Sequence, residues 1–224
     1  MIMETTHYDY LNFIRFTDLR EWDIKRYFSI PIKSDYQIIA LSDILIEQKE
    51  KFKINDSNKD YGILGVNNQT GIFDAYTENG AKIKQKYKRM ECGWIAYNPY
   101  RVNVGSIGIK KESNLYEYIS PAYVVFSCKS SITPDYLFLT MKTNRFHNQI
   151  CNATTGSVRQ NLSFEILKTL QIPLPTLEQQ NNLVELYNTK IHQAESLEKE
   201  AAEINSDIEN YLIEILGIKQ QISN

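Results

Sequence analysis

The chain has 224 residues, and its 25 Lys and Arg nearly balance its 27 Asp and Glu, which gives a formal net charge of −2. Hydrophobic residues make up 42% of the chain and charged residues 23%, values that argue against wholesale disorder. Three cysteines without CxxC spacing support neither a disulfide framework nor a zinc cluster. No apolar run reaches the roughly 18 residues that span a bilayer. We therefore expect a soluble cytoplasmic protein with no membrane association.

The near-neutral charge conceals three segments of different sign. Residues 1–79 carry 9 basic and 13 acidic residues, a net charge of −4, whereas residues 80–175 carry 13 and 5, a net charge of +8. Residues 176–224 carry 3 basic and 9 acidic residues, a net charge of −6. A local excess of +8 is typical of a surface that binds polyanions, although ordinary variation of surface charge produces similar values.

The elements before residue 176 are predicted from short β-prone runs and turn residues. Residues 1–35 contain two aromatic-rich stretches and are expected to form a lead-in segment that packs on another surface. From residue 36 to 175, strands are predicted at 61–66, 94–97, 106–109, 123–126 and 170–174. Helices are predicted at 40–48, 134–148 and 163–169. Because the β runs are irregularly spaced and few helices separate them, this segment is expected to be an α+β domain with a mixed, twisted sheet.

The last segment predicts one long helix over residues 176–216, followed by a tail at 217–224. Thr176 and Gln179 fit a capping box, and Gly217 stands where a helix stops. Steps of three and four residues from Tyr187 pass through nine positions, of which eight are apolar and one is Lys190. This heptad repeat predicts a coiled coil, and a helix about 60 Å long needs a partner helix to cover its stripe. The expected dimer contacts are Tyr187, Ala194, Leu197, Ala201, Ile204, Ile208, Tyr211 and Ile215.

Residues 82–89 contain four lysines at every second position. In an extended conformation these lysines lie on one face about 6.6 Å apart, close to the spacing of phosphates along one DNA strand. The candidates for phosphate contacts are therefore Lys82, Lys84, Lys86 and Lys88, together with Arg89. The alternative is a solvated basic strand edge that binds nothing.

A polar loop follows at residues 98–108. Its Asn98-Pro99-Tyr100 resembles the Asn-Pro-Pro-Tyr element of adenine-N6 methyltransferases, but the second proline is missing and no glycine-rich loop for S-adenosylmethionine precedes it. Methyl transfer by this chain is therefore not expected. Since arginine suits guanine and asparagine suits adenine in the major groove, the candidates for DNA contacts here are Asn98, Tyr100, Arg101, Asn103 and Ser106.

Two further groups of polar residues are candidates for a functional role. Arg159 and Gln160 precede the helix predicted at 163–169 and are either DNA contacts or part of an ordinary capped loop. Glu47 and Lys49, with Asp35 upstream, resemble the acidic pair and lysine of a Mg²⁺-dependent nuclease. Such triplets arise by chance in charged helices, so we interpret Glu47 and Lys49 as the solvated end of the helix predicted at 40–48. No catalytic residue and no metal site is assigned.

The order of these motifs resembles a type I restriction-modification DNA specificity subunit, and in particular one half of such a subunit. The most specific match is the proline-flanked strand at residues 172–175, which runs into Thr-Leu-Glu-Gln-Gln at 176–180. Together the matching stretches cover about residues 36–216, and they lie at 41–44, 80–97, 98–108, 119–126, 156–160 and 172–180.

The resemblance implies a DNA target-recognition domain at 36–175 and a dimerisation and spacer helix at 176–216. Family members carry two such domains, and their two long helices pair antiparallel. The resemblance also implies methylation subunits that supply S-adenosylmethionine and methyl transfer, and restriction subunits that supply ATP hydrolysis and Mg²⁺-dependent cleavage. A single domain and a single helix then imply a homodimer that reads two inverted half-sites.

The sequence therefore predicts a non-catalytic protein that binds double-stranded DNA and holds no cofactor of its own. One alternative is a coiled-coil scaffold with no DNA role, in which the acidic helix carries the activity. Another is a recognition subunit of a different phage-defence methylation system. A half-length fragment that pairs with a full subunit is also left open.

Overall fold

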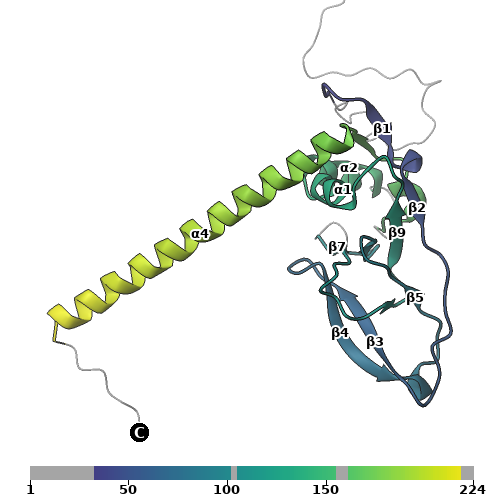
Figure 1. Cartoon of the computed structure of the whole chain (residues 1–224), viewed down its shortest axis with the longest axis horizontal. Helices are drawn as coiled ribbons and strands as arrows, with labels where there is room; N and C mark the ends of the chain where they lie inside the picture. Colours follow the sequence, from purple (N-terminus) through teal and green to yellow (C-terminus); the bar gives the residue numbers. More distant parts are fainter. Residues whose placement is uncertain (1–32, 102–104, 155–160, 218–224) are drawn as a thin grey trace, which may run out of the picture. The chain divides into compact units, whose positions relative to one another are not determined.

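The computed structural model describes residues 33–101, 105–154 and 161–217. Almost all of the predicted lead-in segment and of the predicted tail lies outside these ranges. The described chain divides into two compact units that meet between Leu177 and Glu178, and Figure 1 shows both. We call them the N-terminal domain and the rod, and each is described by itself.

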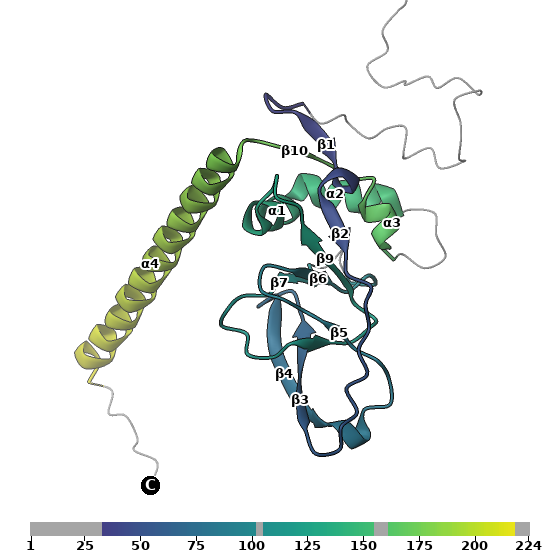
Figure 2. The same ribbon diagram turned by 45° about the vertical axis from the view of Figure 1, so that its right-hand side comes forward.

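Within the described residues the N-terminal domain has three small sheets. Figure 2 shows the first of them in the middle of the domain, the second at one end and the third at the other. The first has the strand order β2-β9-β6-β7, and all its pairs are antiparallel. Its strands are β2 (Leu45–Glu47), β9 (Val124–Cys128), β6 (Ile95–Tyr97) and β7 (Ile107–Ile109). The second has the order β4-β3-β8-β5, with strands β4 (Ile72–Asn79), β3 (Asp60–Val66), β8 (Tyr118–Ile119) and β5 (Lys88–Arg89).

Because β3 pairs parallel with β8 and antiparallel with β4, the second sheet is mixed, as predicted. The third sheet is a single antiparallel pair of β1 (Ile38–Ala40) and β10 (Gln171–Pro173). The α+β class and the mixed pairing are confirmed, and the strands are distributed over three sheets.

Three short helices pack beside the first sheet: α1 (Pro134–Met141), α2 (Asn144–Thr154) and α3 (Phe164–Leu167). The helix predicted at 134–148 is two helices, because the Thr143 hydroxyl accepts the N–H of Phe146 and starts a second one. Thr133 and Ser163 cap α1 and α3, since each side chain accepts a backbone N–H three residues on.

The helix predicted at 40–48 is wrong. This stretch forms β1, a 3-10 turn at Leu41–Asp43 and β2. Leu41, Ile44 and Leu45 are buried at helical spacing, which explains the prediction. However, β1 and β2 find extended partners in β10 and β9, and such tertiary pairing overrides a weak local preference.

The core of the N-terminal domain lies between the first two sheets. One cluster joins both sheets through Leu64, Val66, Ile72, Met90, Ala96, Ile119 and Val125. The largest fully buried rings are Tyr97, Phe126 and Phe146, which fill the side toward the helices. This core fixes the ends of β6 and β7, from which the polar loop at 98–106 projects.

The rod is the single helix α4 (Leu177–Ile215), 39 residues long. It ends as predicted, because Gly217 has a φ of 59°, a conformation that suits glycine after a helix. Among the residues that the structure describes, no helix combines the length and apolar character needed to cross a membrane.

Candidate nucleic-acid interface

The turn at residues 98–101 presents two of the predicted DNA contacts to solvent. Arg101 N–H donates to the Asn98 carbonyl at 3.0 Å, and Asn98 Oδ1 accepts the N–H of Tyr100 at 3.0 Å. These bonds fix the turn with its own side chain. Tyr100 is 59% exposed and Arg101 is exposed. The turn therefore holds an aromatic ring and a guanidinium outward on a rigid support.

The other predicted contacts in the polar loops are placed differently. Ser106 is buried, and its N–H donates to the Arg101 carbonyl at 3.2 Å, so it closes the base of the loop. Asn103, Arg159 and Gln160 lie outside the described residues.

The turn at 98–101 is tied to the segment that follows residues 155–160. Leu162 N–H donates to the Pro99 carbonyl at 2.9 Å, and Tyr97 Oη donates to the Leu162 carbonyl at 3.0 Å. Leu162 itself is fully buried. Two patches that are some 60 residues apart in sequence, 98–101 and 161–162, are therefore adjacent in the fold.

A recess of about 300 Å³ lies beside the same loop, and the sequence did not point to its lining. Asn68 comes from the β3–β4 turn, Gly105 from the β6–β7 loop, and Lys142, Asn144 and His147 from the junction of α1 and α2. The β3–β4 turn packs closely on β7, since a Cβ at Gly108 would collide with the backbone of Gly71 and Ile72. We call residues 67–71, 98–101 and 142–147 the loop face.

The β3–β4 turn is held by one side chain. Asn67 Oδ1 accepts the N–H of Gln69 at 3.0 Å and of Thr70 at 2.7 Å, and Gly71 has a φ of 73°. Asn68 and Gln69 are exposed at its tip. The sequence predicts a loop at residues 67–71 but no functional residue in it. Its amide side chains are of the type that reads base edges.

The basic side chains of segment 82–89 fall into three groups: ion-paired, buried and exposed. Lys82 pairs with Glu78 at 3.5 Å, and Arg89 pairs with Glu117 at 3.3 Å. Lys88 is only 5% exposed. Lys84 and Lys86 are exposed. The expectation of one extended strand with four lysines on one face is therefore wrong: Lys82 ends a 3-10 turn, and β5 contains only Lys88 and Arg89.

Lys88 turns inward because its Nζ donates to the Tyr123 carbonyl at 2.8 Å. Burial lowers the pKa of Lys88 below its ordinary value of 10.5, the neighbouring Lys51 and Lys49 lower it further, and Glu47 opposes the change. This lysine joins β5 to the start of β9. We interpret it as part of the support of the basic surface, with its ammonium directed away from solvent.

The substitution Lys88→Met tests this burial. In the window just below pH 10.5 the unfolded chain keeps the proton that native Lys88 releases, so wild-type stability rises with pH there. The free energy of unfolding of the wild type relative to Lys88→Met should therefore increase from neutral pH toward pH 10.5. Urea unfolding at the two pH values measures this difference. Lys84→Met, at an exposed lysine, should show no such trend.

The residues weighed as a nuclease triplet are placed on a strand end. Glu47 lies on β2, and its carboxylate pairs with Lys49 Nζ at 3.0 Å. The ion pair raises the pKa of Lys49 through a hydrogen bond and charge attraction from Glu47. Lys49 and Glu47 therefore neutralise each other at the edge of the first sheet.

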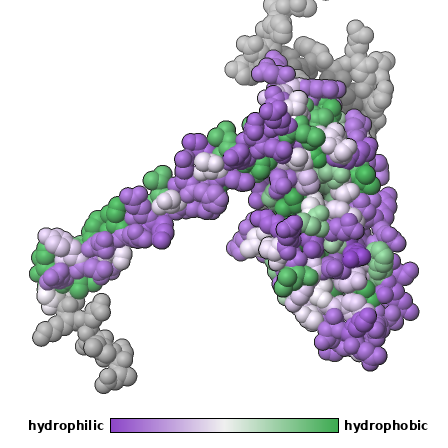
Figure 3. All heavy atoms as spheres, viewed as in Figure 1, coloured by the Kyte–Doolittle hydropathy of each residue, from purple (hydrophilic) through white to green (hydrophobic). Residues whose placement is uncertain are grey.

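The predicted dimer contacts all lie on α4 with their side chains exposed. Leu197 is 65% exposed, Tyr211 62% and Ile215 61%. Figure 3 shows green apolar residues spread along the rod. We call the stripe from Tyr187 to Ile215, with Leu183 one step earlier, the seam. An apolar stripe that follows steps of three and four residues over this length is typical of a helix that pairs with another helix.

The described chain thus combines a domain of small sheets, which carries the polar loop face, with a long helix that carries the apolar seam, and these features define its class. The comparisons with known proteins specify the class. The model of the type I restriction modification DNA specificity domain matches residues 33–206, and the chain belongs to this family.

Solved structures agree with this fold. The HsdS subunit from Thermoanaerobacter tengcongensis superposes with a TM-score of 0.70 at 15% identity and covers 87% of this chain. A second structure, described as the structural basis of complex assembly and conformational transition of the type I R-M system, superposes at 0.67 with 14% identity and the same coverage. This chain spans 53% of the length of either one. No curated protein matches the chain significantly.

Proposed function

We propose that this chain is a DNA-recognition subunit of a type I restriction-modification system that reads double-stranded DNA without catalysing a reaction. The observation that carries the proposal is the family match over residues 33–206. The loop face supports it, because amides, Tyr100 and Arg101 are gathered on rigid turns, and such side chains read base edges. Exposed lysines supply the charge that phosphates require.

We propose further that two copies pair through α4. The N-terminal half of the rod, 177–196, carries three acidic residues and one basic residue, whereas the C-terminal half, 197–215, carries six acidic residues and one basic residue. Antiparallel pairing places each strongly acidic half beside the less acidic half of the other copy, which reduces repulsion. A helix of 39 residues is about 58 Å long, so the two half-sites would be separated by at most about 17 base pairs.

In this proposal the chain acts as part of a complex with other subunits. Methylation subunits would bring S-adenosylmethionine and the methyl transfer, and restriction subunits would bring ATP, Mg²⁺ and cleavage. The chain itself would supply DNA recognition and a place for these subunits to dock. This assignment rests on the family and on the length of the rod.

The proposal is tested by a pair of substitutions and a salt titration. Arg101→Ala should lower the preference for the cognate sequence by about 1–3 kcal/mol, because a bidentate contact to a base is lost. Lys84→Ala should weaken binding to every duplex and reduce the salt slope by about 0.9. Fluorescence anisotropy with cognate and random duplexes measures both effects. A wild type that binds no duplex at low salt would favour the scaffold alternative.

A further inference from the structure

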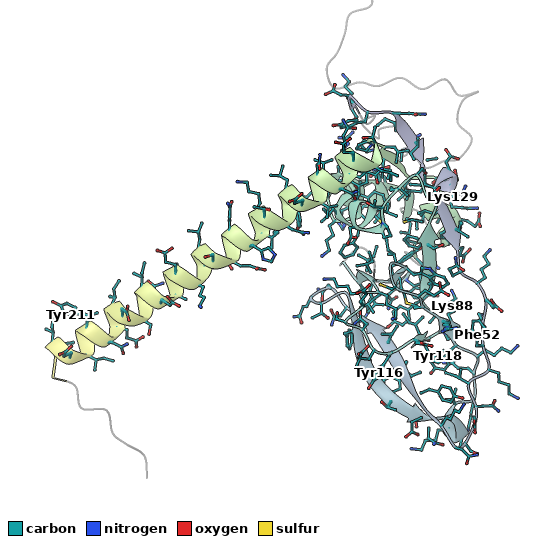
Figure 4. All side chains as sticks on the ribbon, viewed as in Figure 1. Phe52, Lys88, Tyr116, Tyr118, Lys129 and Tyr211 are labelled. Atoms are coloured by element: carbon teal, nitrogen blue, oxygen red, sulfur yellow. The ribbon has the colours of Figure 1, made fainter. Side chains whose placement is uncertain are left out.

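Two separate segments bring their lysines together on the second sheet's side of the N-terminal domain. Phe52 and Tyr87 form an isolated antiparallel bridge, in which Phe52 N–H donates to Tyr87 at 2.7 Å and Tyr87 N–H donates to Phe52 at 2.9 Å. Figure 4 labels Phe52 and the buried Lys88 in this region. Because the pair is antiparallel, Lys53 stands across from Lys86, and Lys51 across from Lys88.

The exposed lysines beside this bridge form no ion pair with a described acidic residue. Lys51, Lys53, Lys84 and Lys86 are exposed, and within the described ranges none of them forms an ion pair. Nearby basic groups behave differently, since Lys49 and Lys82 each pair with a glutamate. No described carboxylate therefore forms an ion pair with these four ammonium groups, whereas the ammonium groups of Lys49 and Lys82 are paired.

Lysines of the two segments therefore stand near one another. Lys53 and Lys86 flank the Phe52–Tyr87 bridge on opposite segments, and like charges that face each other in this way are unfavourable. Buried Lys88 adds another basic residue near Lys51. An anion that spans several of these lysines would relieve the repulsion.

We propose that Lys51, Lys53, Lys84 and Lys86 form a lysine ridge that binds the phosphodiester backbone of duplex DNA. The proposal rests on the DNA-recognition role above and adds to it a phosphate-binding surface built from two segments, of which 51–53 was not predicted from the sequence. Each ammonium group of the ridge can neutralise one phosphate of a duplex.

The chemistry favours DNA over an acidic protein surface. Lysine is depleted in the cores of protein–protein interfaces, where aromatic residues and arginine are enriched. A row of flexible ammonium groups without an arginine suits repeated phosphates, which lysine binds as a point charge. The ridge would thus contribute affinity and register, while the loop face contributes sequence preference.

The double substitution Lys53→Gln/Lys86→Gln tests the ridge in the full-length protein. Removal of two phosphate contacts should reduce the slope of log affinity against log salt by about 1.8 and leave the preference for the cognate duplex unchanged. Fluorescence anisotropy with cognate and random duplexes over a range of salt gives both readouts. Lys53→Arg/Lys86→Arg keeps the charge and should keep the slope. Lys111→Gln/Lys199→Gln removes two exposed lysines elsewhere and should also leave it unchanged.

Three outcomes separate the inference from the function on which it rests. A reduced slope in the Gln pair alone supports the ridge. A wild-type slope in the Gln pair overturns it and leaves DNA recognition standing. A wild type without salt-dependent DNA binding overturns the DNA-recognition proposal and the ridge with it.

Discussion

A monomer is the expected result when Leu197 and Ile204 in the seam are both replaced by glutamate. Full burial of a Leu or Ile contributes about 1.5–3 kcal/mol, and a dimer buries four of these side chains. Their loss therefore costs at least about 6 kcal/mol, which raises the dissociation constant more than about 10⁴-fold. Added carboxylates increase the repulsion between two acidic helices. Sedimentation equilibrium measures the mass of the variant and of the wild type.

The control is Ser206→Glu, which adds one of these two charges to α4 at a position outside the seam. This variant should keep the wild-type mass, because position 206 lies outside the three-and-four spacing of the seam. A dimer in both variants would place the contact on another surface. A monomeric wild type would contradict pairing of identical copies and would direct attention to a longer subunit as the partner.

The second large effect is expected at Tyr97, the residue that joins β6 to the segment before α3. Its ring is fully buried, packs edge to face on Phe126 at 6.2 Å between centroids, and its hydroxyl donates to the Leu162 carbonyl. Burial raises the pKa of the phenol, which keeps the hydroxyl protonated as a donor. Tyr97→Ala should lower the free energy of unfolding by about 3–5 kcal/mol, as for other large aromatic truncations. Urea unfolding measures the loss.

Tyr97→Phe separates the hydrogen bond from the packing. The ring remains, but the Leu162 carbonyl loses its partner in a buried site, which costs about 1–3 kcal/mol. Because Leu162 also bonds to Pro99, the phenylalanine variant should in addition weaken the preference for a cognate duplex. An unchanged stability would mean that water or another donor satisfies the carbonyl.

The sequence was most informative where structure is local. The helix at 176–216 was predicted almost to its ends, because a capping residue, a heptad pattern and a glycine all act within a few residues. The strands predicted at 61–66, 94–97, 106–109, 123–126 and 170–174 correspond to β3, β6, β7, β9 and β10. Each is a short apolar run bounded by turn residues, which defines it without tertiary information.

What could not be predicted depends on partners far away in the chain. β1 and β2 are extended because β10 and β9 pair with them, more than 70 residues later. Lys88 is buried because it reaches a carbonyl 35 residues away. The sequence could not distinguish Lys88 from Lys82, Lys84 and Lys86, because a buried lysine and an exposed lysine occupy the same alternating positions. Likewise, Lys51 and Lys53 join the basic surface only through the Phe52–Tyr87 bridge.

The small sheet of β1 and β10 brings the two boundaries of the sheet-containing domain together. The pair sets Ile38 against Pro173 and Ala40 against Gln171, so the chain enters and leaves the N-terminal domain side by side. A domain whose two ends are adjacent can be inserted or replaced as a unit. Under the DNA-recognition proposal, an exchange of the segment between β1 and β10 would change the sequence preference and leave the connection to α4 intact.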